Sequence, residues 1–375
     1  MKASVDVAVI GGGVIGCSVA YHAARRGASV ALFEAGQIGS GASGAAAGML
    51  AAQAEAREPG PFLDLLLESR EMHRAFGEEL YEETSLDPEY VWAGTLRAAL
   101  DEGPVEELRA RHLWQRRHGL SARWMSGDEA RELEPALSSR TVAALYLPED
   151  GQVNSPRLVR SLSLAAARSG ARVEEFTKVC GLVVEGSTIT GVRTSAGETA
   201  AGAVVLAGGA SSASLVSDLG VEVPVHPVKG EILAAVPPSL PIKANVWDER
   251  CYMVPKRDGR VVIGATEEPG VRDPRPTLGG VAALSGAAVR LVPEISAATF
   301  ASAWGGLRPG TPDNLPVLGP VDGVEGLMLA TGHYRNGVLL APLTGEVISA
   351  LALGETPTTD ISPFSAHRFT RAAHT

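Results

Sequence analysis

The stretch "VAVIGGGVIG", residues 7–16, joins an apolar run to closely spaced glycines. An unbroken apolar run is typical of a strand that is buried on both faces of a parallel sheet. Gly11, Gly13 and Gly16 form the pattern G-x-G-x-x-G. Its glycines permit a tight turn, a close approach of backbone to a pyrophosphate, and close packing of helix on strand. The stretch therefore predicts a strand, a glycine turn and a helix that together bind a dinucleotide.

The residues that follow complete a βαβ unit. Residues 14–26 predict a helix that Gly27 closes, and residues 29–33 predict a second strand. Glu34 ends that strand 18 positions after Gly16, near the ~20 positions typical of an acid that binds ribose hydroxyls. Such an acid repels a 2′-phosphate, while the helix N-terminus attracts the pyrophosphate. We therefore expect a dinucleotide with free ribose hydroxyls and not NADP.

A loop of very small residues, "GQIGSGASGAAAGML" at 36–50, comes next. Ala42, Ala47 and Gly48 would let the backbone come close to a bulky ligand, and Ser43 could bond a phosphate. An NAD domain usually passes more directly into its next helix, so the loop favours FAD over NAD. A flexible linker is the alternative interpretation of the same composition.

The remaining chain alternates predicted helices with short predicted strands. Ser126 and Glu129 match a capping box, and Ser155 is expected to cap a helix whose first turn holds Pro156. "RDGR" at 257–260 predicts a hairpin turn. Further helices are predicted over 62–83, 277–291 and 338–353, and strands over 172–205, 228–236, 244–255, 260–266 and 327–331. The pattern predicts an α/β fold in which antiparallel strands follow the N-terminal unit.

Length and composition limit the classes of protein. A chain of 375 residues suggests two domains, at about 150 residues per domain. The net charge of −10 argues against nucleic acid as a partner, because neutralising phosphates needs a basic face. No apolar run reaches the ~20 residues of a membrane-spanning helix, and the N-terminus lacks the features of a signal peptide. Cys17, Cys180 and Cys251 are far apart, which indicates neither a metal site nor a disulfide framework and favours the cytoplasm.

Several longer motifs go beyond the glycine pattern. They include "GAAAGMLAAQAE" at 44–55, "CYMVPKRDGRVVIGAT" at 251–266, "WGGLRPGTPDNLPVLG" at 304–319 and "TGHYRNGVLLAP" at 331–342. With them the chain resembles the D-amino-acid oxidase family of flavoproteins over nearly its whole length, and in particular its glycine-oxidising bacterial members. The resemblance implies a Rossmann-like FAD-binding domain, discontinuous over 1–86, 150–220 and 303–375, and an inserted antiparallel-sheet substrate domain over 87–149 and 221–302.

The resemblance also implies which residues hold FAD. Besides the glycine turn, they are Val14, Ile15, Glu34, Ala35, Ala42, Ser43, Ala47, Gly48, Met49 and Val179. The C-terminal segment would lie along the isoalloxazine ring through His333, Tyr334, Arg335, Asn336, Gly337, Val338 and Leu339. A helix beginning there would direct N–H groups towards the electron-rich end of the ring. No cysteine follows Cys251 in the sequence, so we expect non-covalent FAD.

Three residues stand out for binding a small amino acid. Arg308 can give a carboxylate two parallel N–H···O bonds, which a lysine cannot. Tyr252 could give the same carboxylate a phenolic hydrogen bond, and Arg335 matches the second substrate-side arginine of the family. The alternatives are a solvated ion pair for an arginine and core packing for the tyrosine. Arg250 and Glu267 replace a histidine and a methionine of a well-known relative, and charged residues there could change the lining of the pocket.

The resemblance implies oxidative deamination of glycine, sarcosine and short D-amino acids. Hydride passes to the flavin, dioxygen reoxidises it to give hydrogen peroxide, and the imine hydrolyses to an oxo acid (glyoxylate from glycine) and ammonia. It also implies that orientation replaces a side-chain base, that glycine imine serves the thiamine thiazole, and that the relatives are often tetramers. A dehydrogenase of the same fold with another electron acceptor, and a flavin-binding module without turnover, are the alternatives. We expect neither a metal nor a membrane partner.

Overall fold

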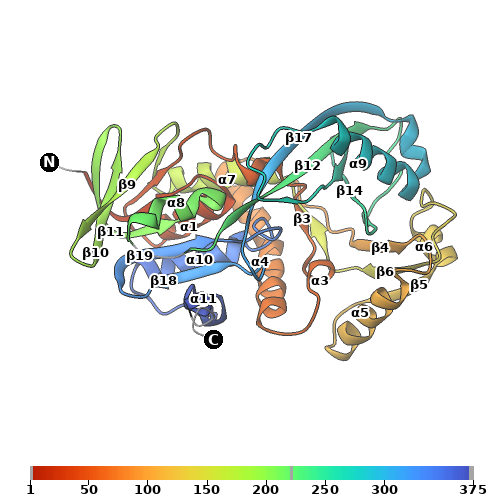
Figure 1. Cartoon of the computed structure of the whole chain (residues 1–375), viewed down its shortest axis with the longest axis horizontal. Helices are drawn as coiled ribbons and strands as arrows, with labels where there is room; N and C mark the ends of the chain where they lie inside the picture. The colour runs from red at the N-terminus through yellow and green to blue at the C-terminus, as the bar shows by residue number, and fades with distance from the viewer. Residues whose placement is uncertain (1–2, 220–222, 371–375) are drawn as a thin grey trace.

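The computed structural model describes residues 3–219 and 223–370, and its α/β fold is built on two large sheets (Figure 1). In the first sheet β1 lies between β2 and β11 and pairs with both in parallel. The order is β18-β19-β10-β11-β1-β2-β8, and β9 pairs with β10. The strands are β1 (Ala3–Ile10), β2 (Val30–Phe33), β8 (Arg172–Glu174), β9 (Val179–Glu185), β10 (Thr188–Thr194), β11 (Gly197–Leu206), β18 (Val317–Val321) and β19 (Val324–Thr331).

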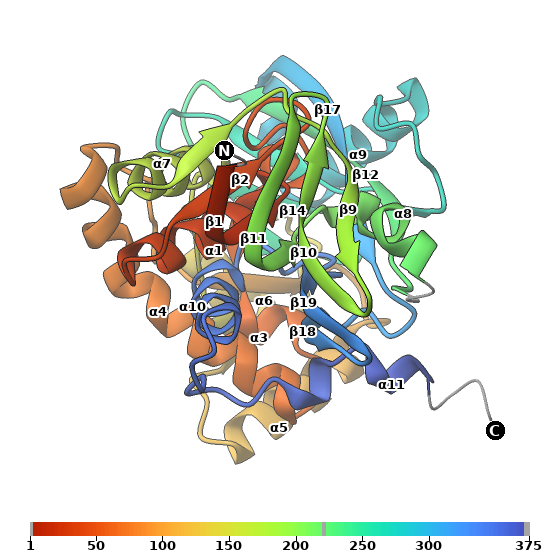
Figure 2. The same ribbon diagram turned by 90° about the vertical axis from the view of Figure 1, so that its left-hand side faces the viewer.

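Both faces of β1 are buried from Val7 to Ile10, as the apolar run predicts. Val7 and Val9 join the core formed with four helices, whereas Ala8 and Ile10 join the core on the opposite face with Val216 of α8. The helices are α1 (Val14–Arg25), α4 (Pro61–Thr84), α7 (Ser155–Arg168) and α10 (Ala341–Ala352) on the first face, and α8 (Ser212–Val216) on the second. Figure 2 looks at this end of the molecule, where α10 and α1 lie beside β1 and β11.

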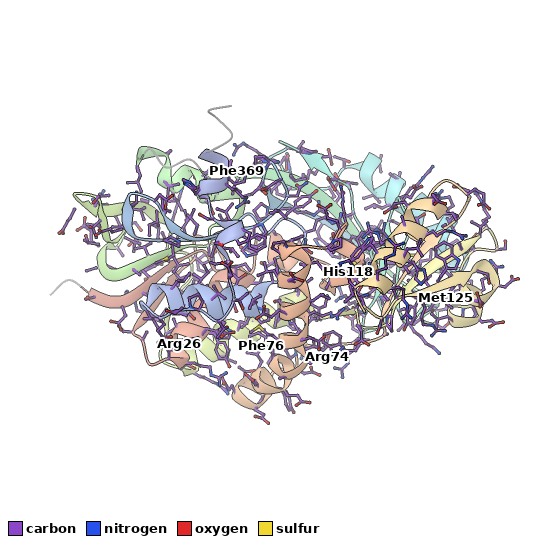
Figure 3. The ribbon with its side chains drawn as sticks, turned by 90° about the horizontal axis from the view of Figure 1, so that it is seen from below. Arg26, Arg74, Phe76, His118, Met125 and Phe369 are labelled. Carbon is purple, nitrogen blue, oxygen red and sulfur yellow. The ribbon has the colours of Figure 1, made fainter. Side chains whose placement is uncertain are left out.

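The first and last long helices of this layer are in direct contact. Gly345 of α10 faces Ser18 of α1 so closely that a Cβ on the glycine would overlap the serine hydroxyl. One turn further along α1, Tyr21 packs against Phe76 of α4, which is labelled in Figure 3, with ring centroids 5.9 Å apart. Residues from the beginning and the end of the chain therefore share one core.

The second sheet lies beside the first and is almost wholly antiparallel (Figure 1). Its order is β16-β12-β15-β14-β13-β4-β6-β5, β17 pairs with β12, and only β13 and β4 pair in parallel within the described chain. The strands are β4 (Thr95–Ala99), β5 (Arg123–Ser126), β6 (Ala143–Leu147), β12 (His226–Val236), β13 (Asn245–Trp247), β14 (Tyr252–Pro255), β15 (Val261–Gly264), β16 (Glu268–Pro269) and β17 (Thr299–Gly310). Leu284 and Ala288 of α9 (Leu278–Leu291) pack with Leu233 and Ile263 in the core of this sheet.

Shorter elements connect the two sheets and finish the chain. They are α2 (Ala42–Ala45), β3 (Met49–Leu50), α3 (Ala52–Glu55), α5 (Val105–Arg117), α6 (Gly127–Leu133), β7 (Gly151–Gln152), α11 (His367–Thr370) and the 3-10 turns Gly209–Ser211, Ser217–Leu219, Pro293–Ala297 and Ser362–Phe364. β3 and β7 pair as a separate two-stranded sheet. β17 pairs with β12 from Thr299 to Gly310, so this strand crosses the domain boundary expected at 303.

Most of the expected elements are confirmed, including the capping box of Ser126, and two local expectations are wrong. The loop at 36–50 contains α2 and β3, because β3 finds a partner in the distant β7. Asn154, not Ser155, is the N-cap of α7, and its side-chain oxygen accepts the backbone N–H three residues further on. The Ser155 hydroxyl donates instead to the carbonyl oxygen of Ser43, at 2.6 Å.

Two further boundaries differ from the prediction. The strand expected over 244–255 is divided, because Asp248 Oδ1 accepts the N–H groups of Arg250 and Cys251, both at 2.8 Å, and so forms the turn between β13 and β14. The helix expected from residue 338, α10, begins instead at Ala341. Pro342 stands in its first turn, where the missing N–H costs no hydrogen bond.

Candidate functional site

A cavity of about 620 Å³ lies where the two sheets meet. Its wall combines the glycine turn after β1, the small-residue loop before β3, the beginning of β9, strand β17 and the segment before α10. Segments that are more than 300 residues apart in sequence, such as Gly11 and Arg335, therefore line one space.

Each glycine of the turn has a different physical role. Gly11 has φ of +106°, and a Cβ there would collide with the carbonyl oxygen of Ala207. A Cβ on Gly16 would collide with the carbonyl oxygen of Gly11, so Gly16 allows α1 to pack on the turn. At Gly13 a Cβ would meet only the Ser43 hydroxyl, at 3.2 Å, so the backbone here is open to a ligand in the cavity.

Glu34 and Ser43 organise the N-terminus of α1. The Glu34 carboxylate accepts the backbone N–H of Gly12 at 2.7 Å and that of Gly36 at 2.8 Å. The Ser43 hydroxyl accepts the N–H of Val14 at 2.9 Å, in the first turn of the helix. An anion at this helix end would meet the remaining free N–H groups, and the carboxylate keeps lone pairs for hydroxyl donors.

Most of the residues expected to hold the cofactor line the cavity. They are Gly11, Gly13, Val14, Ile15, Glu34, Ala35, Ala42, Ser43, Ala47, Gly48, Met49, Val179, His333, Tyr334, Arg335, Asn336, Gly337 and Val338. Gly16 and Leu339 are not part of this wall. Gly16 packs against Gly11, and Leu339 is buried with its carbonyl oxygen turned towards α4.

Two side chains of α4 anchor the C-terminal segment. Ser69 Oγ donates to the carbonyl oxygen of Leu339 at 2.7 Å, and His73 Nε2 donates to the same oxygen at 3.0 Å. His73 Nδ1 accepts from the Tyr90 hydroxyl at 2.8 Å, and burial lowers the pKa of His73 to about 4, so the ring is neutral. No motif singles out Ser69 and His73, and their spacing of four indicates only that they share one helix face.

His333 is also neutral and buried. Its Nε2 lies 3.1 Å from Thr344 Oγ1 of α10, and burial lowers the pKa of His333 to about 3. The next residue, Tyr334, donates its N–H to the carbonyl oxygen of Pro309 at 3.0 Å. This bond fixes the C-terminal segment against β17, directly beside Arg308.

Arg308 and Tyr252 both face the cavity over glycines of the second sheet. A Cβ on Gly230 would collide with the Arg308 guanidinium, and a Cβ on Gly264 would lie 2.5 Å from the Tyr252 hydroxyl. Arg308 Nη1 donates to the carbonyl oxygen of Thr266 at 3.1 Å. Burial raises the pKa of Tyr252, and the neighbouring Arg308 opposes that rise. Among the described residues no carboxylate lies within ion-pair distance of Arg308.

Arg335 has carboxylate partners, in contrast to Arg308. Its Nε lies 3.1 and 3.2 Å from the two oxygens of Glu55, the last residue of α3. Its guanidinium lies 5.1 Å from the ring centre of Trp247, and Arg97 lies 5.0 Å from the same ring. Burial by itself would lower the pKa of Arg335, but Glu55 raises it above its usual value. Glu55 lines the cavity and was not anticipated, although it is the charged residue that ends "GAAAGMLAAQAE".

Arg250 and Glu267, the two charged residues expected to alter the pocket, lie in different places. Arg250 is exposed in the turn between β13 and β14 and is not part of the cavity wall. Glu267, just after β15, also lies outside the wall, but its Oε2 is 3.8 Å from Nη1 of Arg335. Only Glu267 of this pair therefore contacts a residue of the site.

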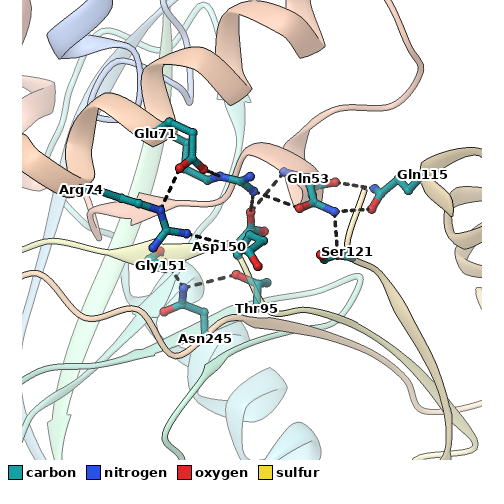
Figure 4. Close-up of polar contacts among 11 residues, drawn as sticks. Gln53, Glu71, Arg74, Thr95, Gln115, Ser121, Asp150, Gly151 and Asn245 are labelled. Carbon is teal, nitrogen blue, oxygen red and sulfur yellow. Dashed lines mark hydrogen bonds and ion pairs between the residues drawn. The ribbon is translucent and has the colours of Figure 1, made fainter. Parts of the chain in front are cut away.

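A buried polar network supports α3 from behind the cavity. Arg70 Nη1 donates to Gln53 Oε1 at 3.0 Å and to Asp150 Oδ1 at 3.3 Å. Figure 4 shows Gln53 turned towards Gln115, whose Oε1 accepts from Gln53 Nε2 at 3.0 Å. Burial raises the pKa of Asp150 to about 6, and Arg70 opposes the rise. The network fixes the helix that carries Glu55.

The described residues, 3–219 and 223–370, contain neither a metal-binding cluster nor a membrane-spanning helix. Within these ranges no group of three or more His, Cys, Asp or Glu side chains is arranged to hold a metal ion. In the same part of the chain no helix has the length and apolar character needed to cross a membrane.

Comparison with known proteins identifies the class to which this site belongs. The DAO model, described as FAD dependent oxidoreductase, matches residues 6–351. The chain belongs to this family of FAD-dependent oxidoreductases, and FAD is its cofactor. Three features of the site suit FAD, which is a dinucleotide. They are the turn at Gly11, where no side chain fits, the free N–H groups at the N-terminus of α1, and the Glu34 carboxylate.

Individual relatives are similar over nearly the whole length. Glycine oxidase from Geobacillus kaustophilus (strain HTA426) is 42% identical over 365 residues, with 97% of each chain covered. The crystal structure of glycine oxidase from Geobacillus kaustophilus superposes with a TM-score of 0.94 at 41% identity, covering 97% of this chain and 98% of that one. The bifunctional protein ThiO/ThiG of Synechocystis sp. is 35% identical over 98% of this chain and 55% of its own length.

Proposed function

We propose that the chain oxidises glycine and other small amines, such as sarcosine and short D-amino acids, with dioxygen as the electron acceptor. The observation that carries this proposal is Arg308, which lines the cavity without a carboxylate partner among the described residues and lies beside Tyr252. Arg308 is partly buried, and a guanidinium that has lost part of its water without gaining a counter-ion favours a ligand that supplies the anion. Relatives named glycine oxidase support the choice of a small amino acid as that ligand.

The proposed cofactor contacts follow the cavity wall. The glycine turn and the N-terminus of α1 would hold the pyrophosphate, Glu34 the ribose hydroxyls, and Val179 the adenine. The loop at 42–49 and the segment at 333–338 would enclose the isoalloxazine ring. When bound, FAD supplies a two-electron acceptor that dioxygen can reoxidise, and we expect it to be non-covalent.

The protein's share of the reaction is mainly orientation. Arg308 would take the substrate carboxylate through two N–H groups, and the Tyr252 hydroxyl would donate a third hydrogen bond. The His333 ring is already bonded to Thr344, and Arg335 is held by Glu55. With these groups engaged, fixing the α-carbon in one position is the main source of acceleration, and the redox chemistry belongs to the cofactor.

A substrate panel tests this function. Purified protein is mixed with glycine, sarcosine, D-alanine and L-alanine in air, and hydrogen peroxide is measured beside the flavin spectrum. We expect peroxide with the first three amines. Bleaching by glycine under nitrogen without peroxide in air would favour a dehydrogenase with another acceptor, and no bleaching at all would favour a binding module without turnover.

Two variants test whether the reaction takes place at the proposed site. Replacing Arg308→Gln should reduce kcat/KM for glycine by about a hundredfold, because a charge-assisted hydrogen bond of roughly 1.5–3 kcal/mol and the orientation of the substrate are lost together. Arg117→Gln, at the exposed end of α5, removes the same charge far from the cavity and should leave kcat/KM unchanged. Equal activity of the two variants would contradict the role of Arg308.

The cellular role and the assembly are proposed on the same basis. Relatives that carry ThiO and ThiG in one chain support supply of glycine imine for the thiamine thiazole in the cytoplasm. Complementation of a thiamine auxotroph that lacks this activity tests the role, and light scattering tests a homo-oligomer. We also propose the division into an FAD-binding part (1–86, 150–220, 303–375) and a substrate-binding part (87–149, 221–302), which limited proteolysis tests.

A further inference from the structure

Two guanidiniums line the cavity, and they differ in their partners, because Arg335 has carboxylate partners and Arg308 has none among the described residues. Arg335 contacts two carboxylates, Glu55 at 3.1 Å and Glu267 at 3.8 Å. Arg308 contacts only a carbonyl oxygen, that of Thr266. The group formed by Glu55, Arg335 and Glu267 therefore carries a net charge of about −1 when all three are ionised, while Arg308 keeps its full positive charge.

Glu267 stands at the rim of the cavity, between solvent and the wall. Its side chain is 51% exposed, whereas that of its partner Arg335 is only 21% exposed. Tyr334, which also lines the cavity, has its pKa raised by burial and by a hydrogen bond to Glu267. Glu267 thus contacts two wall residues from the outside and adds the excess negative charge on that side of the site.

One further guanidinium, that of Arg97, lies near this group and interacts with Glu55. Arg97 packs against the same Trp247 ring as Arg335, but it is not part of the cavity wall, and among the described residues it forms no ion pair with Glu267. Arg308 is the guanidinium left for the first substrate carboxylate. Lys178, the other cation of the wall, lies beside Val179 at the proposed adenine end. A second anionic group on the substrate would therefore face Glu267 without a free guanidinium to receive it.

We propose that Glu267 is a specificity-determining residue that excludes amines carrying a second anionic group. Sarcosine, with a neutral N-methyl group, is accepted, whereas iminodiacetate, with an N-carboxymethyl group, is rejected by charge repulsion at the rim. A built-in repulsive element is an effective way to discriminate between ligands that share all their attractive contacts. The proposal rests on the proposed function, because it concerns the substrate end of the same cavity.

Equilibrium binding of two unreactive ethers tests the proposal without turnover. Methoxyacetate and diglycolate are the oxygen analogues of sarcosine and iminodiacetate, and without an amine they cannot be deaminated. Their Kd values are measured by calorimetry on the flavin-loaded protein, for the wild type, Glu267→Gln, Glu267→Asp and Glu249→Gln. Glu249 is exposed in the turn between β13 and β14 and provides the matched removal of one negative charge.

We expect the ratio of the diglycolate Kd to the methoxyacetate Kd to fall by about five- to tenfold in Glu267→Gln, as expected for a repulsion of two charges several ångströms apart near the protein surface. The ratio should stay near the wild-type value in Glu267→Asp and Glu249→Gln. An unchanged ratio in Glu267→Gln, or an equal fall in Glu267→Asp, overturns the proposal, because the first excludes an effect of this residue and the second excludes its charge.

A turnover series separates this proposal from the proposed function. The ratio of kcat/KM for iminodiacetate to that for sarcosine should rise by the same factor in Glu267→Gln. If no variant and no wild-type protein oxidises any amine, the proposed deamination is overturned, and the binding ratio of the ethers still decides on Glu267. If sarcosine is oxidised and neither ratio moves, only the role of Glu267 is overturned.

Discussion

Nζ of Lys256, the residue after β14, lies 2.6 Å from the carbonyl oxygen of Ala47 in the loop that lines the cavity. The same amino group donates to Gln152 Oε1 at 2.8 Å and to the carbonyl oxygen of Val153 at 3.2 Å. Three acceptors match the three donors of an ammonium group, although burial lowers the pKa of Lys256 to about 7. Lys256 therefore ties the second sheet to the small-residue loop.

Replacing Lys256→Met should weaken FAD retention. The methionine leaves buried acceptors without a donor, each at about 1–3 kcal/mol, and releases the loop that contains Ala47. We expect the FAD dissociation constant, measured from flavin fluorescence on dilution, to rise by at least about tenfold. Lys243→Met, at an exposed side chain, is the control and should leave the dissociation constant unchanged. Normal FAD affinity in Lys256→Met would contradict the role of this contact.

Replacing Glu55→Gln should destabilise the site through Arg335. The amide keeps one hydrogen-bond acceptor but removes the charge that the partly buried guanidinium needs. We expect the free energy of unfolding to fall by about 1–3 kcal/mol, together with a lower kcat/KM for glycine. Glu149→Gln breaks an exposed ion pair with Arg74 and should cost at most about 0.5 kcal/mol. Similar losses in the two variants would mean that Glu55 acts only as a surface charge.

Replacing Gly230→Ala should displace the guanidinium of Arg308. The new Cβ would occupy the position of that group, so we expect kcat/KM for glycine to fall by about a hundredfold, since misplacement by about 1 Å has effects of this size. Gly286→Ala, on the exposed side of α9 with open space around it, should keep full activity and raise the free energy of unfolding by about 0.5–1 kcal/mol. Steady-state kinetics and thermal unfolding distinguish the two.

The buried Asp150 should produce a pH dependence of stability. Its pKa is raised by burial to about 6 from 3.8, so the folded state binds an extra proton between these values. The stability it contributes is fully present below pH 3.8 and is lost as pH rises through 6. In denaturant unfolding between pH 4 and 7, the wild type should lose stability relative to Asp150→Asn as pH rises. A parallel pH dependence of the two proteins would place the ionisation elsewhere.

The N-terminal βαβ unit could be predicted almost completely, because its information is local. The apolar run, the spacing of Gly11, Gly13 and Gly16, and the position of Glu34 lie within one βαβ unit. Each residue type there is required by backbone geometry or charge that the unit itself creates. The structure accordingly has β1, α1 and β2 at the expected places, within one residue or two.

The contacts that hold the C-terminal segment of the site could not be predicted from the sequence in the same way. Glu55 is selected by its contact with Arg335, 280 positions later, and Ser69 is selected by the carbonyl oxygen of Leu339, 270 positions later. No periodicity or motif marks such pairs. The N-cap of α7 shows that prediction can also fail at short range. Asn154 and Ser155 are adjacent and both are suitable N-cap residues, and Asn154 takes the role because the Ser155 hydroxyl is bonded to Ser43.

The contact of α10 with α1 has a consequence for biosynthesis. Gly11 and Asn336 line the same cavity, so the ribosome must deliver nearly the whole chain before the coenzyme can find a complete binding site. Domains fold as units while translation proceeds. The N-terminal βαβ unit would therefore be synthesised long before α10, which packs against α1. A chain that ends before Asn336 would lack part of the cavity wall, so we expect it to retain the coenzyme poorly.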